Sequence, residues 1–371
     1  MGLLRSDRVT QRIFDGHNDV LLRLWQRDRT GARFLSEGTD GHLDLPRARR
    51  GGLAGGLFAT FVPDARPAAE GPAQRADGSL APPSLAALDH ERALAVTLSQ
   101  LAIAFRVERA SAGAVRICRS VADIAAAHAE GRFAMMLHLE GAEAIGPDLD
   151  ELEILVQAGV RSLGLVWSRP TIFGHGVPFR FPSTPDIGEG LTERGIALVK
   201  ACNAFGVMVD VSHLNEKGFW DVVAVSDAPI VATHSNAHVI CPVSRNLTDA
   251  QMDAIRDSEG LAGLNFATFF LREDGRRHAE TPLSLMTRHL DHLLEKLGPR
   301  GVAFGSDFDG ALVPAAIGDA AGLPHLVAAM EQAGYGAELI DAVCYRNWLD
   351  VLARTLKADV QHSGTAALPI G

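Results

Sequence analysis

Six histidine and acidic side chains stand out in the sequence because each lies at or near the end of a short apolar run. The first two, His17 and Asp19, are two residues apart in FDGHNDV. In an extended strand, residues i and i+2 point to the same side, so this pair could hold one metal ion. The other four occur further along the chain: Glu140, His213, His234 and Asp307. Imidazole nitrogens and carboxylate oxygens together form a donor set that suits Zn²⁺.

The apolar runs that carry these groups predict the elements that position them. Eight runs read as β-strands: residues 12–19, 52–62, 132–141, 160–167, 206–213, 229–235, 260–267 and 302–310. Between several of them lie segments with helical periodicity, at 84–106, 191–206 and 282–298. Strands that alternate with helices in this way indicate a parallel sheet covered by helices.

We therefore predict an α/β fold, a (β/α)₈ TIM-type barrel with long loop insertions, and assign residues 1–371 to a single domain. An open Rossmann-like sheet is the alternative. The insertions are residues 63–83, rich in Pro, Ala and Gly, and residues 168–190, which carry three phenylalanines among their prolines and glycines. Aromatic residues in a long loop favour a lid packed over a site.

In such a barrel the carboxyl ends of the strands meet at one face, so the six groups should converge there. One ion seldom takes so many ligands, whereas two Zn²⁺ ions about 3.5 to 4 Å apart, bridged by a carboxylate and a hydroxide, would use them naturally. The ligand assignment is His17 and Asp19 on one ion, His213 and His234 on the other, and Glu140 as the bridge.

Asp307 then has a role distinct from metal binding. Close to the bridging water, it can accept the water's proton and pass it to a leaving group. Each of these residue types is common at strand ends for other reasons, and a lone histidine there is usually a satisfied polar residue. The joint pattern over five strands is what points to a metal site.

Charge and composition limit the remaining functions. The formal net charge of −10 argues against nucleic acid as a partner, because a phosphate backbone needs clustered Lys and Arg. No apolar run approaches the roughly 18 to 20 residues that cross a bilayer. The four cysteines are far apart and form no CxxC pair, and no secretory leader precedes them. We expect free thiols, no membrane span and a cytoplasmic location.

Five motifs, in this order, resemble the membrane (renal-type) dipeptidases, peptidase family M19 of the amidohydrolase superfamily. They are FDGHND, LEG, GLTERGIALVKACNAFGVMVDVSH, THSNAHVICPVSRNLTD and SDFDG. The likeness runs from about residue 13 to residue 350. It implies a (β/α)₈ barrel with two zinc ions bridged by a glutamate, which hydrolyses dipeptides and often tolerates or prefers a D-residue at the C-terminal position.

The resemblance also assigns individual roles. The family's ligands fall on the five positions named above, its catalytic aspartate on Asp307, and its arginine for the substrate carboxylate on Arg245. One position departs from the family: Trp167 stands where typical members have a histidine, and an indole N–H can donate a hydrogen bond but carries no charge. We assign Trp167 to the substrate pocket and consider His175 or Arg169 as replacements for the missing histidine.

The sequence therefore predicts a metal-dependent dipeptidase with two zinc ions and a small dipeptide as its substrate. An N-acyl-D-amino-acid deacylase, or another amidohydrolase acting on small amides, is an alternative with the same metals. A non-catalytic metal-binding or maturation protein is a third reading, which the departure at Trp167 keeps open. The sequence carries no signature of oligomeric state, and a homodimer is left open.

Overall fold

The computed structural model describes residues 11–64 and 86–357, and a parallel β-sheet forms its centre. The strands are β1 (Ile13–Asn18), β2 (Leu53–Phe61), β3 (Val115–Ile117), β4 (Phe133–Glu140), β5 (Val160–Gly164), β6 (Met208–Asp210), β7 (Val231–Ala232), β8 (Leu261–Asn265) and β9 (Val302–Gly305). Neighbouring strands follow the order β1-β2-β4-β5-β6-β7-β8-β9, and each pairing is parallel.

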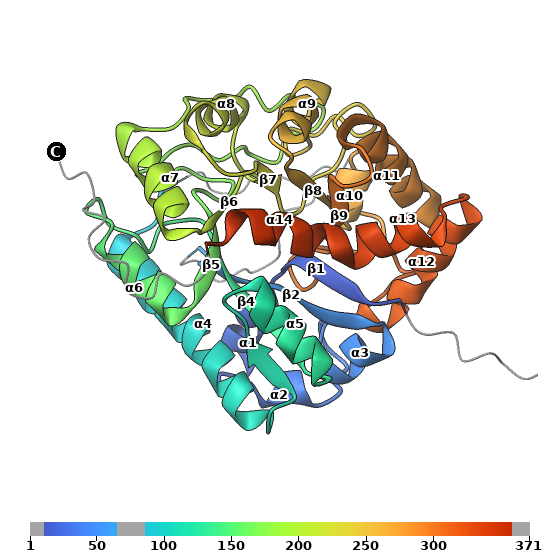
Figure 1. The fold of residues 1–371 in the computed structure, drawn as a ribbon. Helices are drawn as coiled ribbons and strands as arrows, with labels where there is room; N and C mark the ends of the chain where they lie inside the picture. The colour runs from blue at the N-terminus through green and yellow to red at the C-terminus, as the bar shows by residue number, and fades with distance from the viewer. Residues whose placement is uncertain (1–10, 65–85, 358–371) are drawn as a thin grey trace, which may run out of the picture.

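The two ends of this strand order meet. A parallel bridge joins Asn18, at the end of β1, to Phe308, just after β9. The eight-stranded sheet is thus nearly closed into a barrel, with helices around it (Figure 1). The predicted (β/α)₈ barrel is confirmed, and the open Rossmann-like alternative is wrong because the sheet has returned to its first strand.

The eight predicted strands are the eight strands of the barrel, but the structure contains a ninth. Strand β3 pairs only with β4 and lies off the barrel path. Its run, VRI, has a charged arginine at its centre, so hydrophobic content did not mark it as a strand.

Helices cover the outside of the barrel. They are α1 (Val20–Arg27), α2 (Ala32–Leu35), α3 (Leu45–Arg50), α4 (His90–Ala110), α5 (Val121–Ala129), α6 (Asp150–Ala158), α7 (Glu193–Phe205), α8 (Glu216–Val225), α9 (Asp249–Asp257), α10 (Thr268–Leu271), α11 (Leu283–Leu297), α12 (Leu323–Gln332), α13 (Ala337–Asp341) and α14 (Asn347–Thr355), with a 3₁₀ turn at Ala320–Gly322 and a π-helical turn at Ala342–Arg346. The three helices expected from the sequence correspond to α4, α7 and α11.

Helix α4 begins later than the periodicity suggested. Asp89 is its N-cap, and the Asp89 side chain accepts a hydrogen bond from the Arg92 N–H. The cap therefore sets the first helical residue at His90. Helix α7 likewise begins after the cap Thr192, whose hydroxyl accepts the Gly195 N–H.

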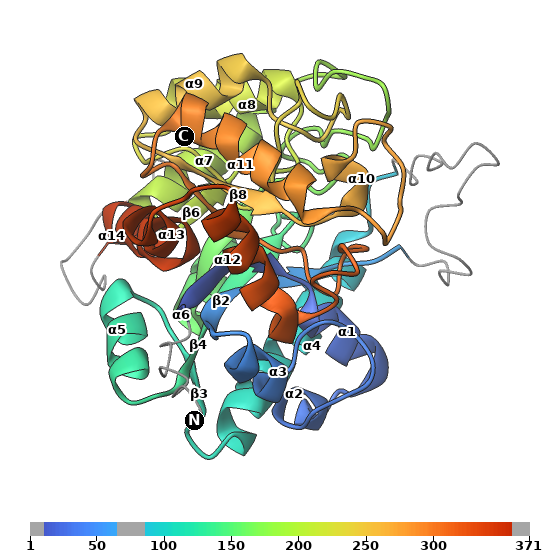
Figure 2. The same cartoon turned by 90° about the vertical axis from the view of Figure 1, so that its right-hand side faces the viewer.

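Helix α14 closes the amino end of the barrel. Asn347 donates hydrogen bonds to the carbonyls of Pro299 and Val302 at the start of β9 (2.8 Å each). The fully buried Trp348 donates its indole N–H to the Phe304 carbonyl (2.8 Å). Figure 2 shows α14 and α10, which follows the carboxyl end of β8, at opposite ends of the molecule. Helix α14 thus packs across the amino end of the barrel.

Two further sequence expectations concern the surface and the thiols. Across residues 11–64 and 86–357, no helix combines the length and apolar character needed to cross a bilayer. The four cysteines are free and buried. Most of the loop expected over 63–83, and the first residues of the helix expected over 84–106, lie outside the described residues. The assignment of residues 1–371 to one domain stays a prediction.

Candidate metal centre and active site

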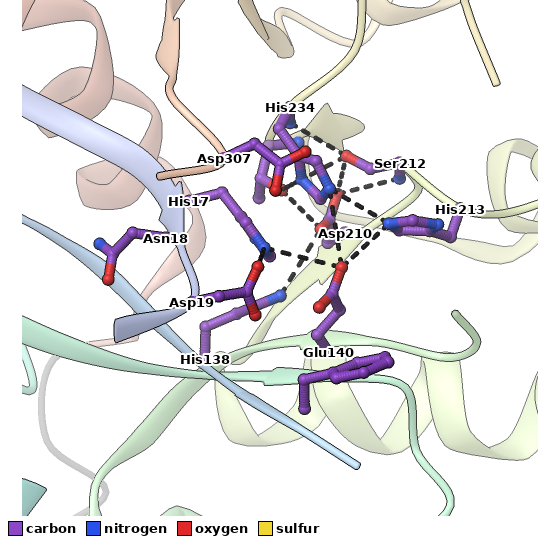
Figure 3. Close-up of polar contacts among 12 residues, drawn as sticks. His17, Asn18, Asp19, His138, Glu140, Asp210, Ser212, His213, His234 and Asp307 are labelled. Atoms are coloured by element: carbon purple, nitrogen blue, oxygen red, sulfur yellow. Dashed lines mark hydrogen bonds and ion pairs between the residues drawn. The ribbon is translucent and has the colours of Figure 1, made fainter. Parts of the chain in front are cut away.

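Glu140 lies at the centre of a cluster at the carboxyl end of the barrel (Figure 3). Its Oε1 is 2.9 Å from His213 Nε2, 3.6 Å from His17 Nε2 and 3.7 Å from His234 Nε2. His17 Nε2 is also 3.7 Å from Asp19 Oδ2, so the pair two residues apart does face the same space. The structure therefore brings together all five residues predicted to bind metal.

The barrel explains this convergence. His17 lies in β1, Asp19 is the N-cap of α1 directly after it, and Glu140 is the last residue of β4. His213 and His234 follow the short strands β6 and β7. These strands run parallel, so the residues at their carboxyl ends reach the same mouth of the barrel.

Buried atoms of this cluster lack hydrogen-bond partners. Both ring nitrogens of His17 and Oδ1 of Asp19 are buried with no partner within the described part of the chain. Leaving such groups unpaired is costly, and native structures rarely do so. A cation among them would accept the lone pairs of Asp19 Oδ1 and of one His17 nitrogen, so the residues fit a metal. Three sets of donor atoms lie within 4.8 Å of one another: His17, Asp210 and His234; Glu140, His213 and His234; His17, Asp19 and Asp307.

The electrostatics of the protein residues also favour a cation. Burial opposes protonation of His17, but the carboxylates of Glu140, Asp19 and Asp307 outweigh it and raise the pKa of His17 to about 10. Burial raises the pKa of the Glu140 carboxyl well above its usual range. Burial thus favours the uncharged form of the Glu140 carboxyl, and bound metal ions would supply the positive charge that favours its carboxylate.

The other two predicted ligands are neutral. Burial, followed by the positive charge of Arg245 and His17, lowers the pKa values of His213 and His234 well below the usual range. A neutral imidazole has one nitrogen lone pair, and His234 can present it at Nε2, toward Glu140, because its Nδ1 is 2.7 Å from Thr233 Oγ1.

Asp210, the last residue of β6, supports the predicted ligands through hydrogen bonds. It was not among the residues predicted from the sequence. Its Oδ2 accepts a hydrogen bond from Thr233 Oγ1 (2.6 Å), which is in turn 2.7 Å from His234 Nδ1. Its Oδ1 accepts the Ser212 hydroxyl (2.6 Å). Burial alone would raise the pKa of Asp210, but His138 and these hydroxyl groups lower it. The chain from Asp210 through Thr233 orients the His234 ring, as outer carboxylates do in metal sites.

His138 is the second residue that the sequence analysis did not single out. It is fully buried, with Nδ1 2.8 Å from Ser162 Oγ and Nε2 3.7 Å from Asp210 Oδ2, and its ring meets His17 edge-on at 5.4 Å between ring centroids. A signal for it existed, because His138 stands two residues before Glu140 in the same strand. The alternation that linked His17 to Asp19 applies to this pair as well.

Asp307 lies beside the cluster, two residues after β9. Its Oδ2 accepts a hydrogen bond from Asn265 Nδ2 (3.0 Å). Burial raises the pKa of Asp307 to about 6, although His17 and Asn265 act in the opposite direction. Asn265 is the last residue of β8, the one barrel strand between β6 and β9 to which the sequence analysis assigned no polar group. A polar residue at a strand end was the signal that could have identified it.

Arg245 is buried against the same cluster. Its guanidinium donates to Ser235 Oγ (2.6 Å), to the His234 carbonyl (3.1 Å) and, through Nε, to His213 Nδ1 (3.2 Å). Burial lowers the pKa of Arg245 to about 10, so the group stays charged at neutral pH. It also lies over the Phe270 ring. The predicted carboxylate-binding arginine is therefore adjacent to two predicted metal ligands.

Trp167 belongs to a row of aromatic rings beside the cluster. Its ring centroid is 5.1 Å from that of Phe61, 5.5 Å from that of Phe179 and 5.8 Å from that of His213. The guanidinium of Arg169 lies over both Phe61 and Trp167. Trp167 is half-buried and borders the predicted ligand His213, which is where a residue of the substrate pocket is expected.

The two residues considered as replacements for the missing histidine are both held elsewhere. Arg169 donates to Glu143 Oε1 (2.7 Å) and to the Val62 carbonyl (2.5 Å). His175 Nδ1 is 3.5 Å from the Gly190 carbonyl. Among the described residues, neither side chain forms a hydrogen bond or an ion pair with the six predicted site residues.

Comparison with known proteins shows which family this chain belongs to. The family model for membrane dipeptidase (peptidase family M19) matches residues 6–364. The chain belongs to the membrane dipeptidase family. This confirms the family, the barrel fold and the enzyme class, a hydrolase acting on peptide bonds, that the motifs indicated.

Solved structures and curated proteins show how close the relatives are. A metallo peptidase from Rhodobacter sphaeroides, liganded with a phosphinate mimic of the dipeptide L-Ala-D-Ala, has 50% sequence identity and a TM-score of 0.91, over 93% of this chain and 99% of that one. Dipeptidase AC, a metallo peptidase of family M19, has 50% identity and a TM-score of 0.88, over 94% and 100%. A Klebsiella pneumoniae protein encoded in the pqqA 5′ region is 48% identical over 68% of this chain and 93% of its own length.

Proposed function

We propose that this family M19 enzyme hydrolyses dipeptides with two zinc ions and accepts a D-residue at the C-terminal position. The observation that carries the proposal is the convergence of three histidine Nε2 atoms on Glu140 Oε1, at 2.9 to 3.7 Å, with Asp307 beside them. The Rhodobacter sphaeroides protein, with half of its residues identical, binds a mimic of L-Ala-D-Ala, which supports the same substrate class here.

Five residues would hold the ions: His17, Asp19, Glu140, His213 and His234. Bound zinc supplies a Lewis acid and lowers the pKa of a coordinated water toward neutrality. Glu140 suits the bridging position because one of its oxygens already lies between His17, His213 and His234. Asp210 and His138, packed beneath, hold the ligand side chains in place.

Asp307 handles the proton in this proposal. It accepts the proton of the attacking water and gives it to the amine that leaves. Burial has raised the pKa of Asp307 to about 6, and a pKa close to the working pH favours a group that must both take and release a proton. Asn265 holds one carboxylate oxygen, which leaves the other available toward the cluster.

Arg245 binds the C-terminal carboxylate of the substrate. Its planar guanidinium matches a carboxylate with two parallel hydrogen bonds, and its fixed place beside His213 and His234 sets the distance from the reacting bond. A longer peptide would present a neutral amide to this buried charge. Length specificity follows because an unpaired buried guanidinium is costly.

The aromatic row borders the same space. Phe61, Trp167 and Phe179 are half-buried rings in edge-to-face contact next to His213. They contact the substrate side chains and help to exclude water from the reacting bond. Trp167 therefore contributes to binding, and it does not replace the charge that a histidine would carry.

A stereochemical panel of dipeptides tests the proposal. Zinc-loaded protein is given L-Ala-L-Ala, L-Ala-D-Ala, D-Ala-L-Ala and D-Ala-D-Ala, and released amine is measured. We expect turnover of L-Ala-D-Ala that metal removal abolishes and zinc restores, with two zinc ions per chain by elemental analysis. N-acetyl-D-alanine is the matched control. Its hydrolysis in preference to all four dipeptides would contradict the proposal and support a deacylase.

A further inference from the structure

We propose that the buried ion pair between Arg23 and Asp309 is a positioning device for Asp307. The inference rests on the proposed function, in which Asp307 handles the proton. Arg23 Nε is 2.8 Å from Asp309 Oδ2, and the side chains are 9% and 0% exposed. Neither side chain forms a described hydrogen bond or ion pair with a side chain of the metal cluster. Any catalytic effect must therefore pass through the backbone, either of the loop that carries Asp307 or of helix α1, where the Arg23 N–H donates to the Asp19 carbonyl (3.1 Å).

The loop after β9 has an unusual backbone. Asp307 and Asp309 both have positive φ angles, 58° and 69°, in the left-handed region that residues other than glycine rarely adopt. Aspartate tolerates this region better than most residues, but each such position still costs free energy. A loop with two of them keeps its shape only if the surrounding structure holds it from both sides.

One side of the loop is attached to strand β1 and the start of α1. The Asp307 N–H donates to the His17 carbonyl (3.0 Å), and the Asp19 N–H donates to the Phe308 carbonyl (2.8 Å). These backbone bonds join the predicted ligand His17 to Asp307 itself, and the predicted ligand Asp19 to the next residue, Phe308. They leave the far side of the loop, from Asp309 onward, to be held by other contacts.

The Asp309 side chain provides those contacts. Besides the Arg23 guanidinium, it accepts the His42 N–H (2.5 Å), and the Asp309 N–H donates to His42 Nδ1 (2.9 Å). Arg23 donates further to the Leu43 carbonyl (2.5 Å). The space is filled, because a methyl group on Gly41 would overlap both Arg23 Nε and Asp309 Oδ1.

Helix α1 links the two sides. Asp19 caps the helix, and Arg23 follows four residues later, where a helix presents its side chain on the same face. A single short helix therefore directs a predicted metal ligand toward Asp307 and a cation toward Asp309. Loss of the Arg23 guanidinium would remove the ion pair that fixes Asp309 in its left-handed conformation. The loop could then rearrange, and the Asp307 side chain could turn away from the cluster.

The expected effect is on the chemical step. Arg245, which binds the substrate carboxylate in the proposed function, follows β7 and donates to Ser235 and to the His234 carbonyl; within residues 11–64 and 86–357 no hydrogen bond joins it to this ion pair. Misplacement of a proton-transfer group by about 1 Å can cost up to about 10²-fold in rate. We expect Asp309→Asn and Arg23→Met to lower kcat about tenfold or more, with KM within about threefold of the parent.

Two variants separate positioning from general stability. Arg23→Lys retains the positive charge and should recover at least part of the kcat lost in Arg23→Met. Asn347→Ala is the matched control, because it removes buried hydrogen bonds at the amino end of the same strand β9. It should lower the melting temperature without changing kcat. Melting curves and zinc content are measured for every variant.

A crystal structure of Asp309→Asn completes the test without depending on activity. Displacement of the Asp307 carboxylate, with loss of its 3.0 Å contact to Asn265, would support the inference. An unmoved Asp307, or an unchanged kcat in Asp309→Asn and Arg23→Met, would overturn it. Absence of dipeptide turnover in the parent protein would refute the proposed function instead, and the position of Asp307 in the variant would still decide this inference.

Discussion

Replacing Asp307 with asparagine is the most direct probe of the proposed chemistry. The variant should fold, because the amide oxygen of the new side chain can still accept the Asn265 hydrogen bond now made at 3.0 Å. It should also retain zinc, since the five predicted ligands are untouched. The change therefore removes proton transfer and little else.

The expected loss follows from the role and the protonation state of Asp307. With a pKa of about 6, the carboxylate is roughly nine-tenths ionised at pH 7, so nearly every molecule carries the base that an amide cannot replace. General acid–base catalysis is worth about 10² to 10⁴ in rate, or about 3 to 5 kcal/mol of activation free energy. We expect kcat to fall within that range while KM changes little.

The assay is hydrolysis of L-Ala-D-Ala by parent and variant at equal zinc content, with released D-alanine measured over a pH series. Bound cations favour the ionised carboxylate, so the acidic limb of the parent's kcat/KM profile should lie at or below pH 6. A variant that keeps more than a tenth of the parent's kcat with full zinc occupancy would show that Asp307 is not the proton-transfer group.

Three further predictions concern binding, packing and protonation. Arg245→Lys should raise KM about tenfold to a hundredfold, because a point charge loses the paired contact with a carboxylate; an unchanged KM in steady-state kinetics would contradict the role. Gly16→Ala should destabilise the fold by about 1 to 3 kcal/mol in denaturant unfolding, because its Cβ would overlap the Trp348 ring; Gly336→Ala, with no atom within 4 Å, is the control, and equal effects would contradict this reasoning. Burial raises the pKa of Asp15 to about 6, above its value in the unfolded chain, so the folded state binds the extra proton and gains stability as pH falls through 6. From pH 7 to pH 5, the free energy of unfolding of the metal-free parent, measured by denaturant unfolding, should therefore rise by about 1 kcal/mol relative to that of Asp15→Asn. A fall relative to Asp15→Asn over the same pH range would refute the assignment.

Much of the fold was predictable because its signals are local. The eight barrel strands are short apolar runs that are buried at nearly every position, so hydrophobic content and the alternation with helices located them. Strand β3 was not identified, because Arg116 interrupts its short apolar run. The start of α4 depended on which polar residue caps it, and periodicity does not distinguish Asp89 from its neighbours.

The residues that support the predicted ligands could not be identified from local sequence signals either. Asp210, His138 and Asn265 are polar groups within or at the ends of strands, where most such residues have ordinary roles. Their importance depends on contacts with His234, His17 and Asp307, which the sequence does not record. The pKa values follow the same rule, because burial and the neighbouring charges determine them.

The sequence by itself determined the chemistry available: which donors exist, that they follow strands, and that strands of this kind form a barrel. Only the tertiary structure decided which of these groups meet. Arg23 and Asp309 are 286 residues apart, and their ion pair exists because the nearly closed barrel brings the end of β9 against β1 and α1. Residue type and alternation are properties of neighbours in the chain, whereas burial and long-range contact arise only when the sheet closes.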